Sequence, residues 1–218
     1  NLLDRLEIDQ PQWNEFDTLE AAVKFTEEIG YPVIIRPSYV LSGSAMIVAY
    51  DESDLQEYIS NLDTVTKEYP IVISKFIDEA KEIEMDAVAC NGELVNYAIS
   101  EHIENAGVHS GDATLILPPQ KLYIETLKKI KKITVKIAKN LNITGPFNIQ
   151  FISKNNDIKV IECNLRASRS FPFVSKTLNV NFIELATKAM VGAKVRRVPI
   201  DIYEIDYVCI KCPMFSFT

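Results

Sequence analysis

The chain has 218 residues, of which 47% are hydrophobic and 24% are charged, so it can bury a sizeable core as one large domain or as two small lobes. Its net charge of −7 argues against general binding to nucleic acids or to anionic membranes. No run of about 18 apolar residues predicts a membrane span, and the N-terminus has no signal-peptide pattern. Because the chain also lacks an initiator methionine, we expect it to be a piece of a longer protein.

Residues 1–78 are predicted to form a small α+β lobe. The segment up to residue 13 is typical of the end of a helix, and Thr18 and Gly30 are typical of the start and the stop of the next helix. The other elements expected in this lobe are strands at 31–37, 47–50 and 70–77, a loop of small residues at 40–46 and a helix at 51–66.

Residues 79–192 are predicted to form a larger lobe, and residues 193–218 an extension towards a following domain. Acidic and apolar residues alternate along 81–89, which predicts a half-buried strand, and Asn91-Gly92 predicts a hairpin turn after it. The other elements expected in this lobe are a strand at 93–100, helices at 121–142 and 182–191, and a hairpin of strands 148–152 and 158–162.

Two local patterns suggest binding sites that the rest of the sequence does not support. Lysines crowd residues 128–132, but the aromatic side chains that would stack on bases are missing, so a solvated helix face is favoured over nucleic-acid binding. Cys209 and Cys212 have C-x-x-C spacing on a segment that alternates like a strand, where residues three apart face opposite sides. No second cysteine pair completes a zinc site, and we interpret the four cysteines as reduced thiols.

Metal-binding oxygens and cationic side chains are concentrated in the run VIECNLRASR, residues 160–169. Glu162 and Asn164 are two residues apart, so they are expected on one face of a strand, and Arg166 continues this alternation. Gln150 can supply a third oxygen from the neighbouring strand. Carboxylate and amide oxygens suit Mg²⁺, and guanidinium groups such as those of Arg166 and Arg169 bind phosphate. The pattern predicts a magnesium–nucleotide site or, as the alternative, a buried salt-bridge network at a sheet edge.

Three further patches could take part in such a site. Arg36 ends a predicted strand, and the Ser/Gly/Ala loop after it could bring backbone N–H groups to phosphates, although it lacks the Walker A pattern and could be a plain turn. Lys75 lies on a strand that leads into the second lobe, where backbone could bind adenine, and Glu82 could bind ribose or lie on a wet strand face. Both histidines lie within 100–112, and we expect His109 to donate a hydrogen bond to an anion rather than to bind zinc.

Several of these strings resemble a known family. The strings RPSYVLSGSAM, ISEHIENAGVHSGDA, GPFNIQF and VIECNLRASRSFPFVSKTL resemble the ATP-grasp domains of the carbamoyl-phosphate synthetase large subunit, over residues 1–192 and in the family's order. The forms VHSGDA and ECNLRASRSFPFVSK look like the second, C-terminal of the family's two ATP-grasp halves, which phosphorylates carbamate. QPQW and FIDEAKEIEMDAV resemble the eukaryotic multifunctional enzymes of the pyrimidine pathway more than the mitochondrial urea-cycle enzyme.

The resemblance implies an α+β fold of the ATP-grasp type, with two lobes that each have an antiparallel sheet and helices and with the nucleotide between them. It also implies roles for individual residues. Mg²⁺ or Mn²⁺ would be held by Gln150, Glu162 and Asn164, and the first two would also contact ATP. The transferred phosphoryl group and the carbamate would contact Arg166, Arg169 and His109. The other nucleotide contacts would be Arg36, Ser42, Gly43, Ser44, Ala45, Lys75, Ile77, Glu82, Gly107, Val108, His109 and Ser110.

The implied reaction is an in-line transfer of the γ-phosphoryl group of ATP to carbamate. Such a reaction depends on positioning and charge neutralisation, and it needs no general base because carbamate is already a nucleophile. Carbamate is unstable in water, which predicts a site closed by a lid. The implied partners are ATP, carbamate made from bicarbonate and ammonia, and the remaining synthetase domains and a glutaminase domain of a cytoplasmic parent chain.

Other functions stay open at this point. One is an ATP-grasp ligase of another specificity, such as a biotin-carboxylase-like enzyme, although the glycine-rich GGGG-type loop of that enzyme is missing here. A second is a fragment of the urea-cycle type of synthetase. A third is a nucleotide-binding interaction module that is inactive when excised, although the clustered charges at Glu162, Arg166 and Arg169 argue against such a loss of activity.

Overall fold

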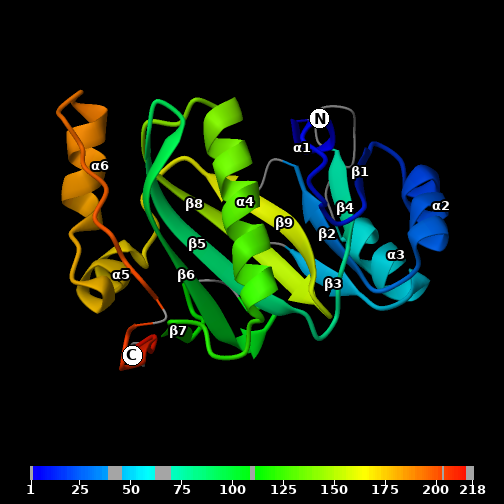
Figure 1. Cartoon of the computed structure of the whole chain (residues 1–218). Coiled ribbons are helices and arrows are strands. Elements are labelled where there is room, and N and C mark those ends of the chain that lie inside the picture. Colours follow the sequence, from blue (N-terminus) through cyan, green and yellow to red (C-terminus); the bar gives the residue numbers. More distant parts are fainter. Residues whose placement is uncertain (1, 39–45, 62–69, 109–110, 203, 215–218) are drawn as a thin grey trace. The chain divides into compact units, whose positions relative to one another are not determined.

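The computed structural model of the protein describes residues 2–38, 46–61, 70–108, 111–202 and 204–214. Figure 1 shows these residues and labels most of their helices and strands. The chain divides into two units, residues 11–78 and residues 1–10 together with 79–218. No helix of the described residues is both long enough and apolar enough to cross a membrane.

The unit of residues 11–78 is a four-stranded antiparallel sheet with two helices on one face. The strand order is β1-β4-β2-β3, with β1 at Trp13–Phe16, β4 at Ile71–Lys75, β2 at Val33–Pro37 and β3 at Ile47–Ala49. The helices are α2 (Leu19–Ile29) and α3 (Glu52–Ser60). The core forms where alternate residues of β2 and β4 pack against both helices, with Ile35, Ile73 and Leu55 fully buried. Burial of these apolar side chains stabilises the unit.

Local signals explain most of this unit. The Thr18 side chain accepts a hydrogen bond from the Ala21 N–H, and Gly30 follows α2 with φ of 71°, which glycine adopts at little cost. Strand β1 was missed, because three of its four side chains are exposed and show no alternation. Helix α3 ends at Ser60, earlier than expected, and residues 62–66 of the predicted 51–66 helix lie outside the described residues.

The second unit is a six-stranded antiparallel sheet covered by helices on both faces. The strand order is β10-β7-β6-β5-β8-β9. The strands are β5 (Lys81–Cys90), β6 (Glu93–Asn105), β7 (Leu115–Leu117), β8 (Gly145–Lys154), β9 (Asp157–Asn164) and β10 (Cys209–Lys211). The helices are α1 (Leu2–Arg5), α4 (Ile124–Asn140), α5 (Phe171–Leu178) and α6 (Phe182–Met190).

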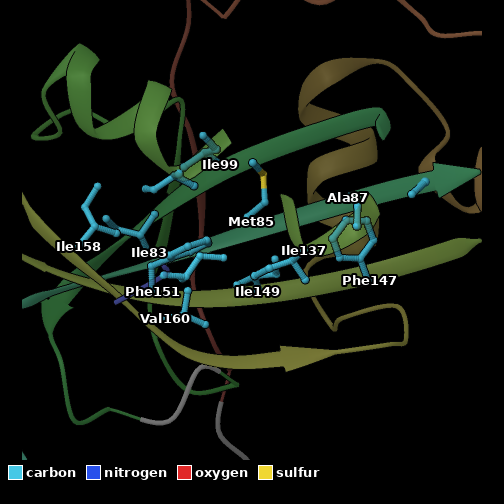
Figure 2. Close-up of a cluster of buried hydrophobic side chains, with 14 of the residues drawn as sticks. Ile83, Met85, Ala87, Ile99, Ile137, Phe147, Ile149, Phe151, Ile158 and Val160 are labelled. Atoms are coloured by element: carbon cyan, nitrogen blue, oxygen red, sulfur yellow. The ribbon is translucent and has the colours of Figure 1, made fainter. Parts of the chain in front are cut away.

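The two faces of this sheet have different cores. Met85, Ile149 and Val160 pack with helix α4 in a large cluster, which Figure 2 shows. Val88, which has the opposite orientation on β5, packs with α5 and α6 in a second cluster. The strand β5 is therefore buried on both faces, and the prediction of a half-buried strand was wrong.

Both ends of the chain pack on this second unit. We had grouped residues 1–10 with the small lobe, but Ile8 is buried in the α4-side core and the Val160 N–H donates to the Asp9 carbonyl, 2.9 Å away. We had treated residues 193–218 as a separate extension, but their described part belongs to the same unit. The Asn96 side chain donates a hydrogen bond to the Val198 carbonyl and accepts one from the Val198 N–H. Tertiary packing rather than local sequence decides both assignments.

Candidate nucleotide and metal site

The predicted metal ligands lie together on one face of the second sheet. Strands β8 and β9 pair so that Gln150 lies opposite Glu162 and Asn148 opposite Asn164. Directly paired residues of antiparallel strands point to the same face, with their Cβ atoms typically about 5 Å apart. The structure thus places Gln150, Glu162 and Asn164 on one face of the sheet, and it adds Asn148, which we had not singled out.

A β-bulge in β9 selects which residues reach this face. The pairing shifts between Gln150 and Phe151, so that Ile161 is an extra residue in β9. Val160 and Cys163 are three apart, yet both pack towards the α4-side core. Only the bulge makes this possible in a strand, and it turns Glu162 to the face that Gln150 occupies.

Cys163 separates two of the candidate ligands but points away from them. Its side chain is half-buried against the α4-side core. Burial, and to a smaller extent the charge of Glu162, raises the pKa of this thiol to about 11. The thiol is therefore protonated at neutral pH and is a poor metal ligand.

Both candidate arginines are exposed on the segment between β9 and α5. Strand β9 ends at Asn164, so Arg166 does not continue the strand alternation, and that prediction was wrong. Residues 165–170, here called the arginine segment, form bends and turns that carry Arg166 and Arg169 with their side chains exposed. Exposed guanidinium groups close to a carboxylate-and-amide set are suited to bind the oxygens of a phosphate or a carboxylate.

Glu82 is near these groups but is buried rather than wet. Burial is the main cause that raises the pKa of its carboxyl group, and the charges of Glu84 and Glu162 raise it further. His102 and the Gly107 N–H act in the opposite direction and lower this pKa. These influences place Glu82, Gly107 and Glu162 in one electrostatic neighbourhood. Val108 follows with its side chain exposed, whereas His109 and Ser110 lie outside the described residues.

The other predicted nucleotide contacts belong to the unit of residues 11–78. Arg36 is exposed on β2, and Ile77 follows β4. The Lys75 ammonium donates to the carbonyls of Gly30 and Tyr31, at 2.9 and 2.8 Å, and burial lowers its pKa. Its side chain therefore holds the turn after α2. The predicted phosphate-binding residues Ser42, Gly43, Ser44 and Ala45 lie outside the part of the chain that the structure describes.

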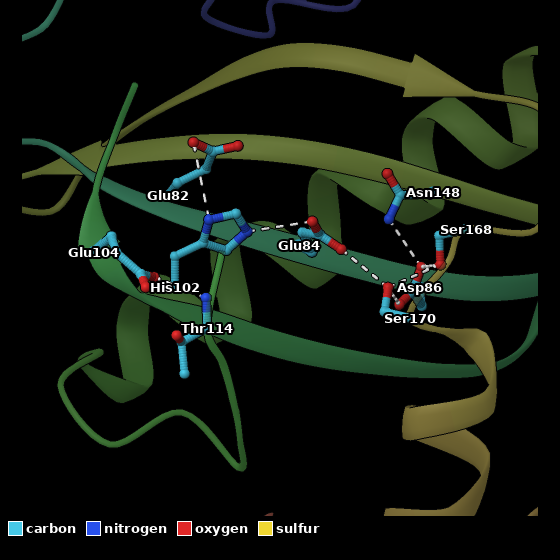
Figure 3. Close-up of polar contacts among 9 residues, drawn as sticks. All are labelled: Glu82, Glu84, Asp86, His102, Glu104, Thr114, Asn148, Ser168 and Ser170. Carbon is cyan, nitrogen blue, oxygen red and sulfur yellow. Dashed lines mark hydrogen bonds and ion pairs between the residues drawn. The ribbon is translucent and has the colours of Figure 1, made fainter. Parts of the chain in front are cut away.

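A buried polar group adjoins the candidate site and was not predicted. Its buried members are Glu84 and Asp86 of β5, Ser100 and His102 of β6, Asn148 of β8 and Ser170 of the arginine segment, and the half-buried Ser168 joins them. Figure 3 shows most of these side chains. The acids at every second position of β5 were a sign of this polar group in the sequence. However, an exposed polar face and a buried polar face of a strand give the same alternation.

His102 lies between Glu84 of this group and Glu82. The fully buried imidazole has Nε2 at 3.2 Å from Glu84 Oε1 and Nδ1 at 4.0 Å from Glu82 Oε2 (Figure 3). Glu82, Glu84 and His102 thus form one buried group of ionisable side chains, and Glu84 lies opposite Gln150 on the same face of the sheet. Among the described residues, Nδ1 of His102 and Oγ of Ser100 are buried without a hydrogen-bond partner.

The donor set fits Mg²⁺ shared with a phosphate group. One carboxylate and two amide oxygens are hard ligands of the kind that Mg²⁺ takes, usually together with water and substrate phosphates. Within the described ranges no three His, Cys, Asp or Glu residues are grouped to hold a metal. A cation held here would depend on oxygens of the nucleotide, as expected for a metal that arrives with ATP.

The sequence matches a known protein family and several long multifunctional proteins. Residues 2–198 match the family model of the carbamoyl-phosphate synthase L chain, ATP binding domain. The chain is 58% identical over 216 residues to multifunctional protein URA2 of Saccharomyces cerevisiae and 54% over 217 residues to multifunctional protein CAD of Squalus acanthias. It is 52% identical over 221 residues to the mitochondrial carbamoyl-phosphate synthase (ammonia) of Mus musculus. These matches cover 99–100% of the chain but only 10%, 10% and 15% of the three relatives.

Solved structures show the same fold. The biotin carboxylase domain of Hydrogenobacter thermophilus 2-oxoglutarate carboxylase, in complex with MgADP, ADP and bicarbonate, has a TM-score of 0.77 at 18% identity and covers 97% of this chain and 48% of that one. Carboxyaminoimidazole ribonucleotide synthase of Aspergillus clavatus, complexed with ATP, has a TM-score of 0.77 at 16% identity and covers 95% and 53%. The predicted α+β ATP-grasp fold is confirmed, and the chain belongs to the family of carbamoyl-phosphate synthase ATP-binding domains.

Proposed function

We propose that this chain phosphorylates carbamate with ATP, giving carbamoyl phosphate and ADP, as the second ATP-grasp half of a pyrimidine-pathway carbamoyl-phosphate synthetase. The observation that carries the proposal is the pairing of Gln150 with Glu162 on the face that also holds Asn164, directly before the arginine segment. The choice of the second half rests on the strings VHSGDA and ECNLRASRSFPFVSK. The identity of 54–59% to several multifunctional proteins favours the pyrimidine type.

Each candidate residue has a role in this reaction. Gln150, Glu162 and Asn164 hold Mg²⁺ or Mn²⁺, which neutralises the charge of the ATP phosphates when it is bound. Arg166 and Arg169 bind the transferred phosphoryl group and the carbamate, together with His109. The remaining contacts to the nucleotide come from Glu82 at the ribose, from Lys75 and Ile77 at the adenine, and from Arg36, Ser42, Gly43, Ser44, Ala45, Gly107, Val108 and Ser110.

The chemistry requires little from the protein beyond this arrangement. A carbamate oxygen attacks the γ-phosphorus as its bond to the β,γ-bridging oxygen breaks, so that ADP leaves as the acceptor gains the phosphoryl group. Arg166 and Arg169 offset the negative charge that two anionic reactants bring together, and a divalent cation held by Gln150, Glu162 and Asn164 would add to this effect. Carbamate is supplied from bicarbonate and ammonia by the rest of a cytoplasmic parent enzyme, including a glutaminase domain.

The reverse reaction gives the sharpest test. The chain is incubated with ADP, carbamoyl phosphate and Mg²⁺, and ATP formation is compared for the wild type, Glu162→Ala and Arg169→Ala. We expect both substitutions to slow ATP synthesis by about 100-fold or more, because Glu162→Ala removes the charged metal ligand and Arg169→Ala removes a cation that stabilises the transferring group. The same comparison with Mn²⁺ in place of Mg²⁺ tests which metal the site accepts.

Matched surface substitutions control for the loss of a charge. Glu184 and Lys188 form an exposed pair on α6, so Glu184→Ala and Lys188→Ala should leave the rate unchanged. A wild-type chain that binds Mg-ADP but makes no ATP from carbamoyl phosphate would contradict the proposed activity and favour the binding-module interpretation. A rate that is indifferent to Glu162→Ala would contradict the metal site.

A further inference from the structure

The arginine segment is fixed by one carboxylate rather than by regular backbone structure. It has no helical or strand hydrogen bonding before Phe171, where α5 begins. Ser168 Oγ donates to Asp86 Oδ1 at 2.6 Å, and Ser170 Oγ donates to Asp86 Oδ2, also at 2.6 Å (Figure 3). The two oxygens of Asp86 therefore hold the residues on both sides of Arg169.

Asp86 lies deep in the sheet and is held from a third side. Its side chain is 1% exposed, and Asn148 Nδ2 donates to Asp86 Oδ1 at 2.8 Å. Ser170 Oγ also lies 3.0 Å from Glu84 Oε2, and the two serine hydroxyls are 2.8 Å apart. The contacts join β5, β8 and the arginine segment through short side chains that have few rotamers.

A buried carboxylate is a costly way to stabilise a fold. Desolvation disfavours the charged group, and a well-packed apolar side chain of similar size would often be neutral or stabilising at such a position. Burial raises the pKa of Asp86 to about 6, which reflects this cost. The presence of a carboxylate at this unfavourable position is better explained by the geometry that it imposes on the arginine segment.

We propose that Asp86 is a positioning residue for phosphoryl transfer, which fixes Ser168 and Ser170 and so holds Arg166 and Arg169 in the orientation that binds the anionic substrate. The inference rests on the proposed function, in which these arginines contact the transferred group. Small misplacements of such groups are costly, because the reacting atoms must be aligned closely for transfer. Asp86 itself touches neither reactant.

The test compares three substitutions in the reverse reaction. Asp86→Ala removes both serine contacts, and we expect kcat to fall by about 100-fold while KM for Mg-ADP changes less than about threefold. Asp86→Asn keeps an acceptor for Ser168 and Asn148 and presents an amide donor to Ser170, so it should recover most of the lost kcat. Ser168→Ala combined with Ser170→Ala removes the same contacts from the other side, so kcat should fall in the same way. This double variant tests the proposal even if Asp86→Ala fails to fold.

Glu101 offers a matched control. It is a carboxylate on the neighbouring strand β6, 3% exposed, and its Oε2 accepts from the N–H groups of Gln120 and Lys121 at 3.0 and 2.9 Å. Glu101→Ala thus removes a buried carboxylate with two hydrogen bonds to a loop, but not to the arginine segment. It should lower stability and leave kcat unchanged.

A second measurement separates this proposal from the proposed function. Backbone ¹⁵N relaxation of residues 166–169 should report greater mobility in Asp86→Ala and in the double serine variant, but not in Glu101→Ala. If the wild type makes no ATP, the proposed function fails, and the relaxation data still decide whether Asp86 fixes the segment. Equal mobility in Asp86→Ala and Glu101→Ala, or a loss of kcat that Asp86→Asn does not restore, overturns the positioning role.

Discussion

At the scale of single residues, the buried acids of β5 carry an energetic cost that depends on pH. Burial raises the pKa of Asp86 from 3.8 to about 6, the charge of Glu84 adds to this, and hydrogen bonds from Ser168, Ser170 and Asn148 oppose it. The folded state therefore binds this proton more tightly than the unfolded state does. The resulting stabilisation is fully present below the unfolded pKa and is lost as pH rises from about 4 to about 6. Two pKa units correspond to about 3 kcal/mol, to order of magnitude.

Asp86→Asn should remove this pH dependence. An amide does not titrate, so the free energy of unfolding of the variant relative to the wild type should rise between pH 4 and pH 7, by up to about 3 kcal/mol. Urea unfolding at a series of pH values measures this difference, and taking the difference cancels the titration of the surface acids. A difference that stays constant over this range would show that Asp86 is charged in the folded state throughout.

At the scale of elements, a helix with capping residues at both ends was predicted correctly. Elements that are defined by contacts with other parts of the chain were missed. Helix α2 was predicted with both ends, because Thr18 and Gly30 act on the adjacent backbone. Strand β7 has three residues and was missed, and so was α5, whose N-cap residue Ser170 makes no capping hydrogen bond. The bulge at Ile161 could not be predicted, since it is defined by the pairing with β8.

The same distinction applies to the candidate site. Glu162 and Asn164 could be placed on one face from their spacing, and the structure brings Gln150 to them. Glu84 and Asp86 were interpreted as solvent-facing, because nothing in an alternating sequence tells which side of a strand faces water. Register across four strands was needed to show that these acids are buried beside the arginine segment.

A capping residue gives the prediction that belongs to this scale. Asn181 precedes α6, and its Oδ1 accepts a hydrogen bond from the Glu184 N–H at 3.0 Å. Asn181→Ala should lower the free energy of unfolding by about 1 kcal/mol, and Asn181→Ser should lose much less, because serine caps a helix equally well. Thermal or urea unfolding measures both. Thr187→Ala, an exposed change in the same helix, serves as the control, and an equal loss there would argue against a capping role.

At the scale of the whole molecule, each unit has a core of its own. The cluster around Leu55 draws its residues from 11–78 alone, and the clusters on the two faces of the larger sheet draw theirs from the other unit. The candidate residues are divided between the units in the same way, with Arg36 and Lys75 in one and the metal ligands in the other. A core substitution should therefore destabilise the unit that carries one group of candidate residues and leave the other unit unchanged.

Leu55→Ala tests this independence. Leu55 is fully buried, so truncation should cost about 2–5 kcal/mol of stability through lost contacts and a cavity. Hydrogen exchange measured by mass spectrometry should speed up in β2 and β4 and stay unchanged in β5 and β8. Ile130→Ala, in the other unit, should show the reverse pattern. Equal acceleration in all four strands after either change would mean that the chain unfolds as one cooperative body.

The orientation of Cys163 has a practical consequence for labelling the protein. A thiol with a pKa of about 11 carries roughly a hundredth of the thiolate of an ordinary cysteine at neutral pH, and thiolate is the species that maleimides attack. Cys212, in contrast, is exposed. A maleimide fluorophore should therefore modify Cys212 well before Cys163, so that binding could be followed by fluorescence with the residue between Glu162 and Asn164 left intact.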